Sequence, residues 1–189
     1  DLGSGVYGTS YLVEKNNQQF AIKEQLVYNN YISQNDSISN IMNEIKIAIN
    51  MGKQKIGPKI YDHYICKEKG LLKVYIVMEY MKLGTLSQWI KNNIFTNKHK
   101  KQIKDKIDKM HKGSNYHRDI HAENIFVTEE DGKPEFYIGD FGLSYSGVEN
   151  IKDKLSKIDN KSFENMINFI VKNRLNSIIS KLFILWKFI

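Results

Sequence analysis

Apolar and polar positions alternate along the first part of the chain, which is typical of half-buried strands. Residues 10–14 and 19–27 form two such segments around a turn, and residues 59–65 and 73–81 form two more. Between the two pairs, residues 35–53 begin with helix-capping side chains and carry apolar residues at helical spacing up to a closing glycine. The pattern predicts a small antiparallel sheet with one helix.

Helical spacing dominates the second part of the chain. Residues 84–93 predict a short helix, and residues 98–112 place Ile103, Ile107 and Met110 on one buried stripe. A hairpin is expected from residues 124–128 and 135–141, and one long helix or two from about residue 162. Because strands come first and helices second, we expect an α+β fold with two lobes.

The chain has 189 residues and a net charge of +7, carried mainly by lysine and densest between residues 98 and 112. These lysines surround the apolar stripe of a predicted helix, so a solvated helix face is favoured, and a nucleic-acid partner remains the less favoured alternative. The apolar residues 178–189 are too short a run for a membrane span and are interrupted by Lys181 and Lys187. We therefore expect a buried helix there and no membrane partner.

Cysteine usage indicates the compartment. Cys66 is the single cysteine, which excludes an internal disulfide and a cysteine-based zinc site. No signal peptide opens the chain, which begins at Asp1 without a methionine, as an excised domain would. We expect an intracellular, cytoplasmic location. The abundance of Lys, Asn and Ile suggests an AT-rich genome, and the sequence carries no signal for an oligomeric state.

A glycine-rich segment lies near the start of the chain. Gly3, Gly5 and Gly8 follow the pattern G-x-G-x-x-G, in which glycines let backbone N–H groups approach a phosphate closely. A plain tight hairpin would explain the glycines equally well. A strand follows them, whereas a dinucleotide-binding unit would continue as a helix, so they belong to a strand–turn–strand flap.

Three carboxylates and one lysine are candidates for phosphate chemistry. Lys23 shares a strand face with the small Ala21, which leaves room for a flat ligand, and Glu44 on the next helix could pair with it. Asp119 and Asn124 lie on one loop, His-Arg-Asp-Ile-His-Ala-Glu-Asn, as a possible proton acceptor and metal ligand. Asp140 follows a strand and precedes Phe-Gly, a position that suits a Mg²⁺ ligand, although each motif alone could be an ordinary turn.

The order of these motifs resembles the protein kinase superfamily. The resemblance covers residues 2 to about 146 and implies a fold with a small antiparallel-sheet N-lobe plus one helix (1–78), a hinge (79–83) and a mainly helical, shortened C-lobe (84–189). It implies an ATP- and Mg²⁺-dependent kinase, most simply a protein serine/threonine kinase, with a protein substrate.

The resemblance also assigns roles to individual residues. Leu2 and the three glycines would cover ATP, Ala21 and the gatekeeper Met78 would line the adenine site, and the backbones of Glu79 and Met81 would hydrogen-bond adenine. The α- and β-phosphates would contact Lys23, held by Glu44; Asp119 would be the catalytic base; Asn124 and Asp140 would bind Mg²⁺.

The sequence departs from the protein-kinase pattern at three places. Ser10 replaces the usual flap valine, and His121 and Ala122 replace a Lys-Pro pair. Small-molecule phosphotransferases of the aminoglycoside or choline type often have this histidine, whereas Arg118 is typical of protein kinases. We interpret His121 either as a substitute for the lysine at the γ-phosphate or as a structural histidine.

The third departure is the length of the chain after the Asp-Phe-Gly motif. Only 47 residues follow Gly142, without an Ala-Pro-Glu segment. This resembles the compact atypical kinase of the KEOPS complex, and residues 56–63 resemble vaccinia-related and other viral kinases, so a viral or parasite origin is one interpretation. Two alternatives to a protein kinase therefore remain: a small-molecule phosphotransferase on the same fold, and a pseudokinase scaffold.

Overall fold

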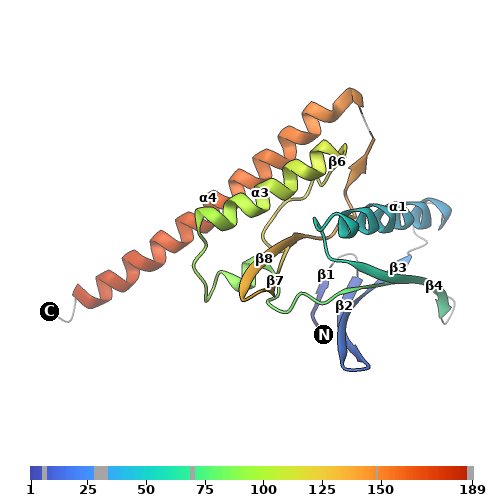
Figure 1. Ribbon diagram of the computed structural model, residues 1–189, viewed down its shortest axis with the longest axis horizontal. Helices are drawn as coiled ribbons and strands as arrows, with labels where there is room; N and C mark the ends of the chain where they lie inside the picture. The colour runs from blue at the N-terminus through green and yellow to red at the C-terminus, as the bar shows by residue number, and fades with distance from the viewer. Residues whose placement is uncertain (6–7, 28–33, 69–70, 148, 187–189) are drawn as a thin grey trace.

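The structure is a computed structural model that describes residues 1–5, 8–27, 34–68, 71–147 and 149–186. Its first part is a five-stranded antiparallel sheet flanked by helix α1, Gln34–Lys53 (Figure 1). The strands stand in the order β1 (Gly3–Gly5), β2 (Gly8–Lys15), β3 (Gln18–Val27), β5 (Leu71–Glu79) and β4 (Ile60–Glu68). The predicted sheet and helix are confirmed, and β1 and β2 form the strand–turn–strand flap expected at the glycines.

The hairpin β2–β3 carries the residues that face the candidate site. Asn16 and Asn17 form its turn with φ values of 53° and 61°, and a tight two-residue turn of this kind fits the twist of the strands. The register places Ser10 opposite Lys23. Because side chains alternate along a strand, Lys23 points to the same face of β3 as Ala21.

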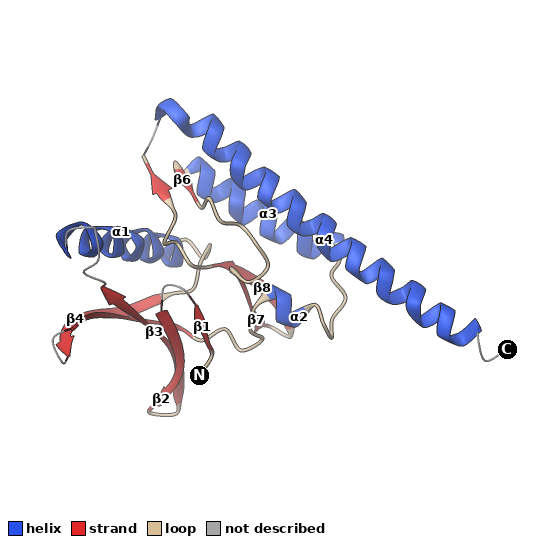
Figure 2. Ribbon diagram, turned by 180° about the vertical axis from the view of Figure 1, so that it is seen from behind, coloured by secondary structure: helices blue, strands red, loops and turns tan. Residues whose placement is uncertain are grey.

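The second part of the chain is built on helices and a hairpin (Figure 2). It contains α2 (Leu86–Trp89), α3 (Asn97–Lys112), β6 (Asn115–Tyr116), the hairpin β7 (Ile125–Glu130) and β8 (Lys133–Ile138), β9 (Tyr145–Ser146), a 3-10 turn (Glu149–Ile151) and α4 (Lys152–Trp186). Helices α3 and α4 lie side by side and antiparallel (Figures 1 and 2). The predicted α+β fold is confirmed.

A large apolar cluster joins the helices to the hairpin. The predicted stripe of α3, formed by Ile103, Ile107 and Met110, is at most 1% exposed. It packs into one cluster with Phe136 of β8 and Phe163 of α4, both fully buried. Each fully buried large apolar side chain contributes about 1.5–3 kcal/mol. This core fixes both ends of the loop between α3 and β7.

Helix α4 differs from the sequence prediction. It is one helix and begins at Lys152, ten residues before the expected start near residue 162. The early turns bury only Leu155 and Asp159, so their apolar period is too weak to be recognised in the sequence. The predicted burial of residues 178–189 concerns side chains outside the described part. Within that part, no helix is long and apolar enough to cross a membrane.

Candidate active site

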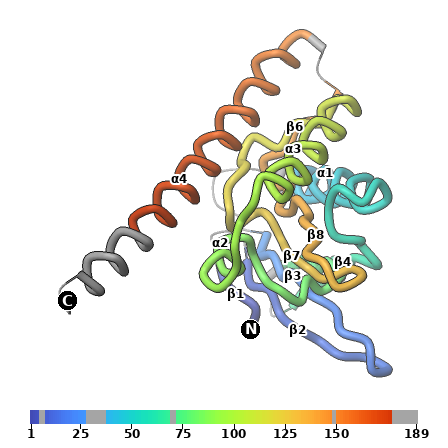
Figure 3. Tube along the Cα trace, turned by 60° about the vertical axis from the view of Figure 1, so that its left-hand side comes forward, coloured from blue at the N-terminus to red at the C-terminus, as the bar shows by residue number. Residues whose placement is uncertain are grey.

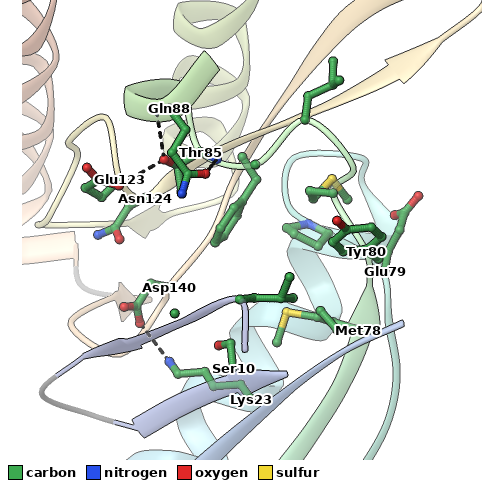
Figure 4. A pocket seen from close by; sticks show the side chains of 18 of the residues that line it. Ser10, Lys23, Met78, Glu79, Tyr80, Thr85, Gln88, Glu123, Asn124 and Asp140 are labelled. Atoms are coloured by element: carbon green, nitrogen blue, oxygen red, sulfur yellow. Dashed lines mark hydrogen bonds and ion pairs between the residues drawn. The ribbon is translucent and has the colours of Figure 1, made fainter. Parts of the chain in front are cut away.

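A cavity of about 860 Å³ lies between the sheet and the hairpin β7–β8 (Figure 4). Strands β1, β2, β3 and β5 form one wall, and the loop before β7, β7 itself and the segment after β8 form the other. The sequence-predicted residues that line it are Leu2, Gly3, Gly8, Ala21, Lys23, Met78, Glu79, Met81, Asp119, His121, Asn124 and Asp140. The structure therefore gathers residues from distant segments around one space large enough for a nucleotide.

Two predicted residues are absent from this lining. Glu44 lies behind Lys23, where it is 7% exposed and reaches the lysine from α1. Gly5 belongs to β1 and pairs with Gly8, but it does not line the cavity. The predicted flap is thus a hairpin. Both of its strands face the cavity, but Gly5 does not line it.

Lys23 holds two carboxylates from different parts of the fold. Its Nζ atom lies 2.8 Å from Glu44 Oε1 and 3.0 Å from Asp140 Oδ1. Burial acts to lower the pKa of the Lys23 ammonium, but the two carboxylates outweigh it, and the pKa lies above its ordinary value. The lysine is therefore a fixed cation at the inner end of the cavity.

Of the two carboxylates that pair with Lys23, Asp140 is the more exposed. Burial acts to raise its pKa, but the Lys23 ammonium and hydrogen bonds from Lys23 and the Gly142 N–H outweigh it and leave the pKa below its usual value. Its backbone has a φ of 59°, which is uncommon for a residue with a side chain and is maintained only where the surroundings fix it. The ionised carboxylate is thus held at the cavity wall (Figure 4).

The loop between β6 and β7 brings three predicted residues together. The Asn124 side-chain amide donates to the Asp119 backbone oxygen at 3.0 Å and to Asp119 Oδ2 at 3.2 Å. His121 Nε2 lies 3.4 Å from the same carboxylate oxygen, and its side chain is 46% exposed. The side-chain NH₂ of Asn124 holds the Asp119 carboxylate in one orientation. The side-chain Oδ1 of Asn124 is left available as a ligand.

The buried His117 ring links this loop to the segment that follows β8. It is fully buried, its Nε2 lies 2.9 Å from the Gly139 carbonyl oxygen, and its Nδ1 accepts the Asp119 N–H at 3.2 Å. These two contacts require a neutral ring with its proton on Nε2. Burial lowers the pKa of the His117 imidazole, which favours this neutral form.

Asp159 of α4 anchors the same loop and was missed by the sequence analysis. Its side chain is fully buried; Oδ1 accepts the Arg118 N–H at 2.6 Å, and Oδ2 accepts the His117 N–H at 2.8 Å. His111 of α3 reaches Oδ2 as well, at 2.8 Å. The available signal was weak: Asp159 lies at helical spacing between Leu155 and Phe163, where an apolar residue would be expected.

Several other lining residues lacked a sequence signal. Phe126 of β7 faces the cavity, and its ring also packs where a Cβ on Gly139 would lie, 2.2 Å from the ring. At the outer edge, Thr85 donates to Glu123 at 3.0 Å and caps α2 together with Gln88 (Figure 4). These residues look like ordinary strand, cap and turn positions until the cavity is known.

The donor set fits a magnesium ion that shares its ligands with a nucleotide. Among the described residues, no three His, Cys, Asp or Glu side chains gather into a metal site. Asp140 and Asn124 do line the same cavity and offer a carboxylate and an amide oxygen. Mg²⁺ typically takes one or two carboxylates and completes its shell with phosphates and water, so this sparse set suits it better than an all-protein site would.

Comparison with known sequences assigns the family. The Protein kinase domain family model matches residues 1–165. The chain belongs to the protein kinase domain family. The match extends past the motifs into α4 and includes Asp159.

Curated relatives of this kinase domain carry protein kinase names, several of them serine/threonine-protein kinases. Serine/threonine-protein kinase ppk35 of Schizosaccharomyces pombe is 28% identical over 76% of this chain and 22% of its own length. Protein kinase C-like 1 of Candida albicans is 26% identical over 75% of this chain and 13% of its own length. The serine/threonine-protein kinase pakD of Dictyostelium discoideum is 28% identical over 75% of this chain and 9% of its own length. The chain thus spans less than a quarter of the length of these relatives.

Proposed function

We propose that this kinase domain transfers the γ-phosphate of ATP to a serine or threonine hydroxyl of a protein. The observation that carries the proposal is the cluster of Lys23, Glu44 and Asp140, whose cavity also contains Asp119 and Asn124. Together these residues supply a fixed cation, Lys23, an oriented carboxylate, Asp119, and two oxygen ligands, Asp140 and Asn124. Phosphoryl transfer requires mainly such positioning and charge stabilisation.

In this proposal the nucleotide lies under the β1–β2 hairpin, with adenine between Ala21 and Phe126. The Glu79 N–H already donates to the Lys59 carbonyl at 2.8 Å, and the Met81 carbonyl accepts the Gly84 N–H at 3.0 Å. Adenine would therefore use the other backbone group of each residue, the Glu79 carbonyl and the Met81 N–H. Met78 would border the inner side of the adenine site, and Gly3, Gly5 and Gly8 would cover the phosphates.

Mg²⁺ would be held by Asp140 and the Asn124 carbonyl oxygen. When bound, the ion neutralises phosphate charge and orients the γ-phosphate. The lysine adds a second positive charge on the α- and β-phosphates, since Glu44 holds Lys23 at the cavity wall. Both charges would be in place before the reaction, so little reorganisation would be needed.

Asp119 would orient the acceptor hydroxyl and take its proton. The hydrogen bond from the Asn124 amide fixes the carboxylate toward the cavity, and a group that is already oriented loses little entropy in the reaction. A positioned base contributes about 10²–10⁴-fold in rate. The carboxylate is 44% exposed, so an acceptor can reach it from the solvent side.

A small-molecule phosphotransferase is the second candidate, favoured by one observation. His121 stands beside Asp119 at the cavity wall where protein kinases usually have lysine. The protein kinase names of the relatives favour a protein acceptor. A pseudokinase scaffold is disfavoured because Lys23, Asp119, Asn124 and Asp140 are all present and face one cavity.

We also propose a division into an N-lobe (1–78), a hinge (79–83) and a shortened C-lobe (84–189). The change from sheet to helices after β5 supports this division. An intracellular, cytoplasmic location and a viral or AT-rich genome remain predictions from composition.

The decisive experiment is a radiolabelled ATP assay with a broad panel of proteins and small molecules. The Asp119→Asn variant serves as the matched inactive control, since it keeps the shape of the side chain. We expect labelled protein with the wild type and at least a hundredfold less with the variant. Labelled small molecules would favour the second candidate. The absence of any label, together with no melting shift in Mg·ATP, would refute the kinase proposal.

A further inference from the structure

A glutamine occupies a buried position near the end of β3. Gln25 is 4% exposed and shares a strand face with Lys23 and Val27. Val27 belongs to the apolar cluster under α1, which also contains Ile45. An apolar residue would therefore be expected at position 25, because glutamine is seldom fully buried.

The Gln25 side chain contacts the carboxylate that pairs with Lys23. Its Nε2 donates to Glu44 Oε2 at 3.1 Å, while the Lys23 ammonium takes Glu44 Oε1 at 2.8 Å. The reverse amide orientation would put an oxygen against the carboxylate, so Nε2 is the atom that faces it. Both oxygens of Glu44 are thus held by two residues of one strand.

The contact has a cost for the fold. Gln25 Oε1 is buried and has no hydrogen-bond partner among the described residues. A buried polar atom without a partner destabilises the folded state, and such a group calls for a functional explanation. Leucine at this position would avoid the unpaired oxygen and continue the apolar packing of Val27.

We propose that Gln25 is a positioning residue that keeps Glu44 turned toward Lys23 before a nucleotide binds. Without it, one oxygen of the buried carboxylate would lose its partner, and rotation of Glu44 away from the sheet would cost less. Helix α1 would then more often leave the position in which Glu44 reaches Lys23, and Lys23 would lose the partner that orients it. The inference rests on the proposed kinase function for its effect on turnover, but not for its effect on α1.

In this role the sheet itself holds α1 where Glu44 reaches Lys23, because Gln25 belongs to β3. Kinases commonly control the lysine–glutamate pair through the segment after the Asp-Phe-Gly motif. Here residues 141–151 form the whole connection from Asp140 to α4. The Gln25 contact comes from β3 and does not depend on that connection.

The test compares Gln25→Leu and Gln25→Met with a matched control, Gln102→Leu. Gln102 likewise donates to a glutamate, Glu135, at 3.3 Å and has a buried Oε1 without a partner among the described residues, but it lies on α3. The first readout is hydrogen exchange of α1 amides without nucleotide. We expect exchange in residues 38–53 to rise several-fold in both Gln25 variants and to stay unchanged in the control.

The second readout is kcat/KM for ATP beside the melting temperature. We expect Gln25→Leu to lower kcat/KM about tenfold, as for a lost hydrogen bond to a charged group, without lowering the melting temperature. In a Glu44→Gln background the same change should have little further effect. A purely structural glutamine would instead make activity follow stability.

The outcomes separate the two proposals. Unchanged α1 exchange in the Gln25 variants overturns the positioning role, whatever the activity. Faster exchange with wild-type kcat/KM overturns it as well, because α1 would then move without consequence for turnover. If the wild type binds no Mg·ATP, the proposed function fails, while the exchange measurement still decides whether Gln25 holds α1.

Discussion

Lys23 Nζ lies 3.0 Å from Asp140 Oδ1, although the two residues are 117 positions apart in the sequence. The contact joins β3 of the sheet to the segment that follows β8 (Figure 3 shows the chain path). It places a cation beside the carboxylate that we assign to magnesium. A metal ion at Asp140 would therefore share this carboxylate with Lys23, so the charge at position 140 should control the metal requirement.

The first prediction concerns Asp140→Asn. This change keeps the shape of the side chain and removes the charge that attracts a divalent ion. We expect the Mg²⁺ concentration for half-maximal turnover to rise about tenfold or more. Asp105→Asn, on the exposed face of α3, is the matched control and should leave the Mg²⁺ dependence unchanged. An unaltered Mg²⁺ titration for Asp140→Asn would contradict its assignment as a metal ligand.

The second prediction concerns Asp159, which anchors the loop between β6 and β7. Asp159→Ala leaves the backbone N–H groups of His117 and Arg118 without their acceptor. Each buried donor left without a partner costs about 1–3 kcal/mol, so the two together cost about 2–6 kcal/mol. A chain of this size loses about 2–4 °C in melting temperature per kcal/mol, so we expect a fall of roughly 4–24 °C.

A matched exposed pair provides the control for this measurement. Asp105→Ala removes the ion pair with Lys101, in which both side chains are at least 60% exposed. Exposed pairs contribute about 0–1 kcal/mol, so its melting temperature should change by at most a few degrees. Equal shifts for the two variants, measured by calorimetry, would mean that Asp159 is no special anchor.

The third prediction is a pH dependence of stability that arises from His117. Burial lowers the pKa of this imidazole in the folded state, so the unfolded chain takes up a proton first as the pH falls. Stability from the neutral ring is therefore complete above a pH of about 6.5 and declines between this value and the lower folded pKa. The slope for one proton is about 1.4 kcal/mol per pH unit.

Denaturant unfolding at several pH values measures this slope, and His117→Gln provides the comparison. Glutamine can still donate to the Gly139 carbonyl but does not titrate. The difference between the two slopes isolates His117 from His99, whose pKa is also lowered by burial. Identical slopes for wild type and variant would show that His117 does not control the acid loss of stability.

Sequence pattern predicted the elements whose periodicity is complete within a short segment. The stripe of Ile103, Ile107 and Met110 and the shared face of Ala21 and Lys23 follow directly from helix and strand geometry. The short strands β6 and β9 were not predicted, because two residues become a strand only through their partner. Their pairing is a long-range property that local spacing does not contain.

The candidate site was predicted where a motif carries the chemistry, and missed where packing does. Lys23 and Glu44 were expected to pair and Asp140 to bind Mg²⁺, since each belongs to a motif with a family role, but the direct contact between Lys23 and Asp140 was not predicted. Gln25 and Asp159 were missed because their importance depends on what lies opposite them after folding. A polar residue at a position where the pattern requires an apolar one is the signal that both share.

The last prediction concerns His121, which separates the two candidate acceptors. Its Nε2 lies 3.4 Å from Asp119 Oδ2, and its half-exposed side chain lines the cavity. If His121 acts in place of the usual lysine at the γ-phosphate, lysine should replace it well, since the lysine ammonium also donates hydrogen bonds from nitrogen. We expect His121→Lys to keep most of the activity.

His121→Ala removes the donor altogether and should lower kcat about tenfold or more while sparing ATP affinity, because adenine and the inner phosphates bind elsewhere. Steady-state kinetics with a protein acceptor and with small-molecule acceptors checks both variants. Wild-type turnover in His121→Ala would reduce His121 to packing and remove the main support for a small-molecule acceptor.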